Sequence, residues 1–186
     1  MNSSLLKKCS IIVNEEYYDI VNKDIDEVSK YYPWIKEVYI PTVTPISKIY
    51  EVIVVNKKFI EDSFSMEEDF INEYSKKVFV IVPNNYPNTH CLVYGGDWID
   101  VEKTSYDDRH FYPQECGLNL FCVGVPKSVN DYANIILENL KTVENMLNAY
   151  ELYQKGEINT LELLSYSHGK EGEKEYGKQK RKNRNR

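Results

Sequence analysis

The sequence predicts an α+β domain in which a small antiparallel sheet is followed by a loop and a long helix. Residues 35–101 hold four or five short segments rich in β-branched and aromatic residues, which is typical of strands. Their short connections favour an antiparallel meander, because parallel neighbours need a crossover of a dozen or more residues. Beyond residue 130 the apolar residues recur at helical spacing instead.

The strands are expected at residues 35–43, 48–55, 77–82, 91–94 and 98–101. A Gly-Gly-Asp sequence at 95–97 is a strong turn signal between the last two. Ahead of the sheet, the apolar positions of 5–31 predict one or two short helices, which Pro33 ends. A capping box at 65–68 predicts a further short helix over 66–74.

The long helix is predicted by its apolar periodicity and by residues suited to its two ends. Asn130 offers a cap, so the helix is expected to begin near Asp131, and Gly156 is placed to end it. The face predicted to be buried consists of Ile136, Leu140, Val143, Leu147 and Tyr150. Much of the other side is polar, with Glu138, Asn139, Lys141 and Glu144. Asn159 or Thr160 can cap a short helix that follows, through residue 164.

Composition and charge indicate a single soluble domain. Of the 186 residues, 42% are hydrophobic and 28% are charged, as in ordinary globular proteins. We expect one domain over 1–172 and a basic, disordered tail over 173–186. The net charge is −6 despite that tail, so the folded body is acidic, which argues against general nucleic-acid binding. The sequence has neither the ~20 apolar residues of a membrane span nor the run of a signal peptide, so we expect a cytoplasmic protein.

The cysteine pattern argues against a metal centre. Cys9, Cys91, Cys116 and Cys122 form no CxxC pair and match no common zinc spacing. His90 is adjacent to Cys91 in an expected strand, where neighbouring side chains point to opposite faces, so the two cannot bind one ion. We therefore expect free thiols in a reducing compartment, without a metal or another cofactor.

Cys122 is the candidate reactive residue. It stands in a short apolar run between Gly117 and Gly124, just ahead of the predicted long helix. Reactive thiols occur in such places because nearby backbone N–H groups stabilise thiolate or oxyanion charge. Free cysteine is also among the most buried residue types, so a packed and unreactive Cys122 is the alternative.

Four segments carry a resemblance to a known family: Tyr86-Pro87, His110-Phe-Tyr-Pro113, Gly117-Leu-Asn-Leu-Phe-Cys122 and Met146-Leu-Asn-Ala-Tyr-Glu151. Their order resembles that of ubiquitin-conjugating (E2) enzymes, and more closely that of the E2-like proteins of bacterial anti-phage operons of the CBASS (cyclic-oligonucleotide) type. The resemblance spans about residues 77–176. It implies an E2-like fold, with an antiparallel four-stranded sheet, flanking helices and a long C-terminal helix.

The resemblance also implies an activity: Cys122 accepts the C-terminal acyl group of a partner as a thioester and passes it to an amine. The implied partners are an E1-like activating enzyme and, as acyl donor, a cGAS/DncV-like nucleotidyltransferase. The family's His-Pro-Asn pattern is absent, and His110 begins a different segment in its place. His110 can help to deprotonate the amine or orient the loop, and Asn119 can donate an oxyanion hydrogen bond. A packing role for this histidine and a turn role for this asparagine are the alternatives.

Three further alternatives remain open at this point. Cys116 lies close enough in the sequence to Cys122 to be the nucleophile instead. The altered His-Pro-Asn region favours a catalytically inactive E2 variant that serves as a binding module. An unrelated α+β domain with structural cysteines is the third, and burial separates it from the others, because an E2 nucleophile needs exposure at the mouth of a shallow groove.

Overall fold

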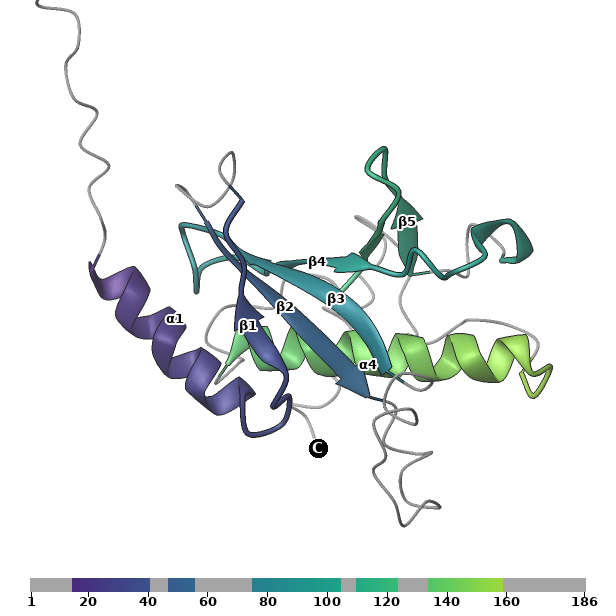
Figure 1. The fold of residues 1–186 in the computed structure, drawn as a ribbon, viewed down its shortest axis with the longest axis horizontal. Helices are drawn as coiled ribbons and strands as arrows, with labels where there is room; N and C mark the ends of the chain where they lie inside the picture. The colour runs from purple at the N-terminus through teal and green to yellow at the C-terminus, as the bar shows by residue number, and fades with distance from the viewer. Residues whose placement is uncertain (1–14, 41–46, 56–74, 105–109, 124–133, 159–186) are drawn as a thin grey trace, which may run out of the picture.

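The centre of the protein is an antiparallel sheet whose six strands lie in the order β1-β2-β3-β4-β6-β5. The computed structural model describes residues 15–40, 47–55, 75–104, 110–123 and 134–158. Along the chain its elements are α1 (Glu15–Val28), β1 (Ile35–Glu37), β2 (Lys48–Val55), β3 (Ser75–Val82), β4 (Leu92–Gly95), the 3₁₀ helix η1 (Val101–Lys103), β5 (Phe111–Pro113), β6 (Asn119–Phe121) and α4 (Ile135–Gln154). Figure 1 shows α4 running across one face of the sheet.

Strands β2 and β3 form the longest pairing, because both are rich in β-branched residues and alternate regularly. They pair over their whole lengths, from Lys48 opposite Val82 to Val55 opposite Ser75. The alternation points one set of valines toward the helices, and all of these are buried: Val52, Val54, Val78, Val80 and Val82. We call this face the helix side and the other face the far side.

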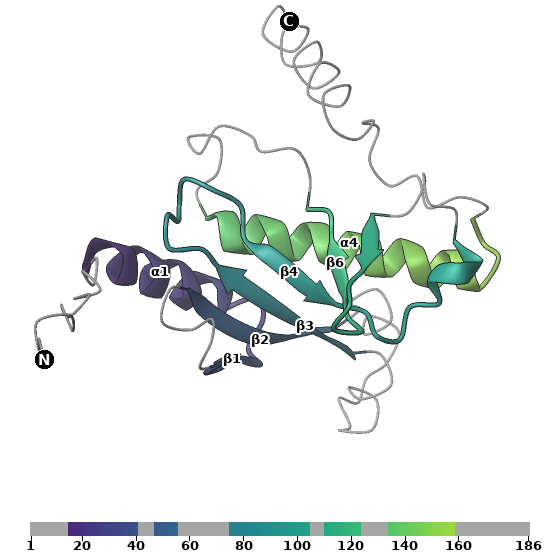
Figure 2. The same ribbon diagram turned by 90° about the horizontal axis from the view of Figure 1, so that it is seen from above.

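Both helices pack on the helix side. Helix α4 lies across the sheet and α1 packs beside it, as Figure 2 shows from above. The five residues predicted to form the inner face of α4 are all buried: Ile136, Leu140, Val143, Leu147 and Tyr150. Asn139, expected on the polar side, is buried as well, because its side chain reaches the start of β4 and accepts a hydrogen bond from the Cys91 N–H at 3.1 Å. Two layers thus enclose one core.

The prediction for the start of α4 is wrong, and the prediction for its end is confirmed. The N-cap is Asn134, whose side chain accepts a hydrogen bond from the Leu137 N–H at 2.9 Å, so the predicted cap at Asn130 is wrong. Asn134 also donates to the backbone oxygen of Asp24 at 2.8 Å, so the start of α4 is joined to α1. The predicted end at Gly156 is confirmed, since its φ of 70° is a left-handed conformation that glycine adopts without strain.

The α+β class and the C-terminal helix are confirmed, but the predicted number of strands is wrong. Residues 111–121, expected to be a loop, form the hairpin β5–β6, with Gly117 in its turn at a φ of 81°. Because β6 occupies the edge of β4, with Asn119 opposite Gly95, the segment 98–101 cannot pair there. It forms a turn instead, closed by the Ile99 N–H on the Gly96 oxygen at 2.9 Å, and leads into η1.

The remaining predicted elements have mixed outcomes. A helix within 5–31 is confirmed as α1, which ends before Pro33. The predicted helix over 66–74, the short helix through 164 and the tail over 173–186 lie outside the described residues.

A buried carboxylate fastens α1 to the rest of the core. Asp24 is 8% exposed and accepts a hydrogen bond from the Tyr86 hydroxyl, in the segment between β3 and β4. Burial raises the pKa of the Asp24 carboxyl above its ordinary value, although the hydrogen bond from Tyr86 acts in the opposite direction. The free energy of unfolding is therefore expected to depend on the protonation of this side chain.

Candidate functional site

Cys122 lies directly after β6 and continues the hairpin by one residue. Its backbone N–H donates to the His110 oxygen at 2.7 Å. Since Phe111 lies opposite Phe121 in the β5–β6 register, the next pair outward is His110 and Cys122. Side chains directly opposite in an antiparallel pair share a face, with Cβ atoms about 4.5–5.5 Å apart. The structure therefore brings two of the three predicted site residues together as cross-strand neighbours.

The alternation of β6 assigns this pair to the far side. Phe121 and Phe111 are buried on the helix side, where the Phe111 ring packs against Tyr150 of α4 at 5.7 Å between ring centroids. The next residue in an extended chain points the opposite way, so Cys122 and His110 project from the far side. Cys122 is half-buried, whereas His110 is only 6% exposed.

The surface beside Cys122 on the far side is apolar. The β4–β6 register, with Val93 opposite Phe121, continues outward to Leu92 opposite Cys122. Leu92 is 46% exposed, and Ile81 lies opposite it on the next strand. The thiol thus stands at the end of a cross-strand row of aliphatic side chains, which an apolar segment of a partner can contact.

Asn119, the third predicted site residue, does not join the pair. Its side chain is buried on the helix side and donates to the Gly96 backbone oxygen at 2.6 Å. Three residues of extended chain put its Cα about 10 Å from that of Cys122, and its side chain points to the other face of the sheet. This geometry supports the turn role, in which Asn119 fixes the turn after β4.

The other cysteines differ sharply in their surroundings. Cys116 is exposed in the turn of the β5–β6 hairpin, where the Gly117 N–H donates to the Gln114 oxygen at 3.0 Å. Cys91 is 1% exposed, and its burial raises the pKa of the thiol far above the ordinary value, so Cys91 is unsuited to nucleophilic chemistry. Cys9 lies outside the described residues. The two candidate nucleophiles are therefore an exposed thiol at the tip of the hairpin and a half-buried thiol at its open end.

The opposition of His110 and Cys122 is not predicted from the sequence, because it depends on the register of the hairpin β5–β6. A signal was present in the sequence. The signal is a symmetric arrangement of residues about a turn that contains Gly117. On one side of the turn stand Phe111 and Pro113, and on the other stand Asn119 and Phe121 at the same spacing.

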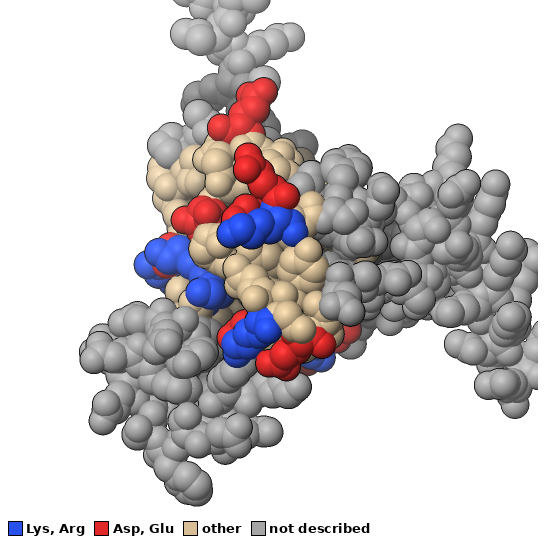
Figure 3. All heavy atoms as spheres, turned by 90° about the vertical axis from the view of Figure 1, so that its right-hand side faces the viewer, with Lys and Arg blue, Asp and Glu red and all other residues tan. Residues whose placement is uncertain are grey.

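Positive and negative side chains are interleaved at the end of the molecule where α4 ends (Figure 3). Two ion pairs contribute at this end, Lys155 with Glu151 at 3.3 Å and Lys103 with Asp100 at 2.8 Å. The described part of this face therefore lacks the basic stripe that binds a phosphate backbone.

Neither a metal cluster nor a membrane span is found in the described parts of the chain. They contain no group of three or more His, Cys, Asp and Glu side chains that could hold an ion. None of their helices has the length and apolar character needed to cross a bilayer.

Comparison of the chain with protein-family models, with curated proteins and with solved structures gave no match.

Proposed function

We propose that the protein is an E2-like conjugating protein of bacterial anti-phage defence, which carries an acyl group on Cys122. The observation that carries the proposal is the cross-strand pair of Cys122 and His110 beside an apolar row on the far side. A cysteine thiol is a nucleophile suited to acyl transfer, and an adjacent histidine is the kind of side chain that can accept its proton.

The order of the structural elements also supports the proposal. Strand β3, Tyr86-Pro87, strand β4, the segment with His110 and Cys122, and helix α4 follow one another as the family resemblance implies. The additional hairpin departs from the implied four-stranded sheet, and it is the hairpin that positions the thiol.

The chemistry consists of two balanced exchanges. The Cys122 thiolate attacks the thioester carbonyl of an E1-like enzyme, a new S–C bond forms, and the E1 sulfur leaves as a thiolate. An amine nitrogen then attacks the same carbonyl, the bond to Cys122 breaks and an amide forms. The proton lost by the nitrogen neutralises the departing thiolate. The acyl group arrives activated, so a separate base is not required for the first exchange.

A second candidate, an inactive E2 variant that binds partners, is favoured by two observations. His110 is 6% exposed, which limits its access to an incoming amine. Asn119, in turn, donates to Gly96 and faces away from Cys122, so its side chain is not placed to stabilise an oxyanion there. In this function the apolar row is the contact surface and the thiol has no chemical role.

The deciding experiment is a non-reducing gel of the protein with an E1-like enzyme, a cGAS/DncV-like nucleotidyltransferase and ATP. We expect a shifted band that a thiol reductant removes, that Cys122→Ala abolishes and that Cys116→Ala retains. A band lost only with Cys116→Ala would show that Cys116, in the hairpin turn, carries the acyl group. The absence of any band, with an E1 proven to form its own thioester, would favour the binding module.

A further inference from the structure

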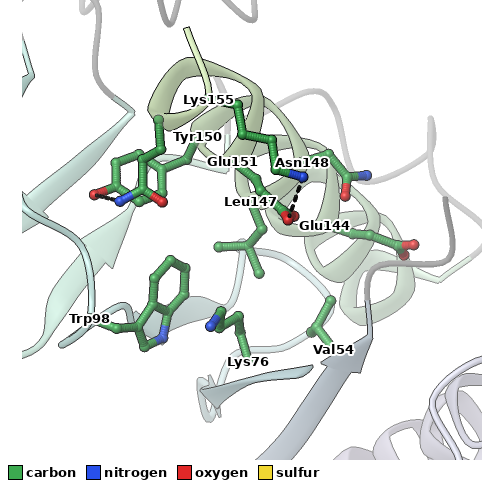
Figure 4. A pocket seen from close by; sticks show the side chains of 10 residues that line it. Val54, Lys76, Trp98, Glu144, Leu147, Asn148, Tyr150, Glu151 and Lys155 are labelled. Atoms are coloured by element: carbon green, nitrogen blue, oxygen red, sulfur yellow. Dashed lines mark hydrogen bonds and ion pairs between the residues drawn. The ribbon is translucent and has the colours of Figure 1, made fainter. Parts of the chain in front are cut away.

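A hollow of about 340 Å³ lies between the C-terminal half of α4 and the sheet. This volume falls within the range of small-molecule sites, about 300–1,000 Å³. Figure 4 shows Trp98 and Lys76 on the sheet side, with Leu147 pointing from α4 into the space between them and Val54. The hollow is on the helix side, so it is distinct from the Cys122 site on the far side.

Lys76 is unusual because it faces inward. It lies opposite Val54 in the β2–β3 register, and the inward positions that follow on its own strand are fully buried valines, Val78, Val80 and Val82. Inward positions of a packed strand are normally apolar, so a lysine at such a position is uncommon. Its ammonium lies over the ring of Trp98 at 5.0 Å from the centroid.

Two acidic side chains line the hollow, Glu144 and Glu151, and each binds a group other than Lys76. Glu151 forms an ion pair with Lys155 at 3.3 Å, and Glu144 accepts a hydrogen bond from the Tyr32 hydroxyl at 2.7 Å. No carboxylate within the described ranges lies within ion-pair distance of the Lys76 ammonium, which contacts the aromatic face instead. Among the described residues, this half-buried cation therefore has no anionic partner.

We propose that the hollow binds a small aromatic carboxylate, whose anionic group pairs with Lys76 and whose ring packs against Trp98. Leu147 and Val54 supply the remaining apolar walls. An ion pair gains strength where water is partly excluded, and a half-buried lysine gives that condition. Lys76 repels an ammonium ligand, and the two carboxylates that would attract one are each bound to another side chain, Glu151 to Lys155 and Glu144 to Tyr32. This site does not depend on acyl transfer at Cys122.

The test is a titration followed by tryptophan fluorescence. The chain has 2 tryptophans, and Trp34→Phe leaves Trp98 as the single reporter. The probes are phenylacetate, its neutral amide phenylacetamide, and benzylamine, which presents the same ring with a positive charge. We expect saturable quenching by phenylacetate, and binding at least tenfold weaker for the other two probes.

Two variants identify the role of the cation. Lys76→Met keeps the length and apolar stem of the side chain and should weaken phenylacetate binding about tenfold, whereas Lys76→Arg should retain it. Lys77→Met is the matched control, because Lys77 is exposed, adjacent and paired with Glu51 at 3.5 Å on the far side. Circular dichroism would confirm that each variant is folded.

Three outcomes would overturn the proposal. The first is the absence of saturable quenching by phenylacetate in the folded parent protein. The second is equal binding of phenylacetate and phenylacetamide, which would show that charge has no part in recognition. The third is undiminished binding in folded Lys76→Met. None of these outcomes bears on the thioester gel, so the two proposals fail separately.

Discussion

Replacing Asn119 with alanine separates a structural role from a catalytic one. The substitution removes the hydrogen bond to the Gly96 oxygen, worth about 1 kcal/mol net. The Gly96 oxygen keeps its bond from the Ile99 N–H, so the larger penalty of an unsatisfied buried acceptor does not apply. The roughly 40 Å³ left by the truncated side chain costs about 1 kcal/mol more. We expect a loss of about 2 kcal/mol in the free energy of unfolding, or about 6 °C in Tm for a chain of this size.

The assay is urea denaturation followed by tryptophan fluorescence, with thioester formation measured on the same preparations. Asn145→Ala is the control, because Asn145 is exposed on α4 and its removal should change stability by less than about 0.5 kcal/mol. A structural role predicts lower stability with thioester formation retained at temperatures where the variant is folded. Unchanged stability with lost thioester formation would refute the reasoning and make Asn119 an oxyanion donor.

Three further outcomes are expected. Asp24→Asn should change the pH dependence of stability. Because the pKa of Asp24 is raised in the folded protein, ionisation of this carboxyl opposes folding at neutral pH. The free energy of unfolding of the wild type should therefore rise relative to that of the variant as the pH falls toward about 4, which urea denaturation at a series of pH values measures. Leu140→Ala should cost about 2–5 kcal/mol in urea unfolding, since this side chain is 0% exposed, whereas Leu92→Ala, at 46% exposed, should cost less than about 1 kcal/mol. Peptide mapping after alkylation should find Cys116 modified in the native protein and Cys91 only after unfolding.

Each of these expectations has an opposing result. A constant stability difference between wild type and Asp24→Asn over the acid range would mean that this carboxyl is not perturbed by burial. Equal costs for the two leucine variants would contradict the packing of α4 on the sheet. Rapid alkylation of Cys91 under native conditions would show that the start of β4 opens readily.

The elements predicted best are those with a strong local pattern. The apolar period of α4 and the β-branched alternation of β2 are visible in the sequence. Strand β2 has the expected bounds, and α4 is present with the expected buried face but begins at Ile135 instead of near Asp131. The hairpin β5–β6 is not predicted, because its strands have only three residues each and alternation over so short a length is a weak signal. The cap of α4 depends on a contact between Asn134 and α1, which is 110 residues away in the sequence.

The candidate site shows the same division between local and tertiary information. The sequence identified His110 and Cys122 as candidates by residue type and by family resemblance. Their opposition across two strands follows from the register, and the bond between Asn119 and Gly96 joins residues that are 23 positions apart. The inward direction of Lys76 is readable from strand alternation, but its position over Trp98 requires the packing of the turn after β4.

The most direct test of the account is to trap the acyl group on residue 122. With serine in place of cysteine, an E2-type transfer leaves an oxygen ester that resists thiol reductants. We expect Cys122→Ser to accumulate this ester with an E1-like enzyme, the nucleotidyltransferase and ATP, and peptide mass spectrometry to locate it at position 122. An ester that forms with Cys116→Ser but not with Cys122→Ser would contradict the account.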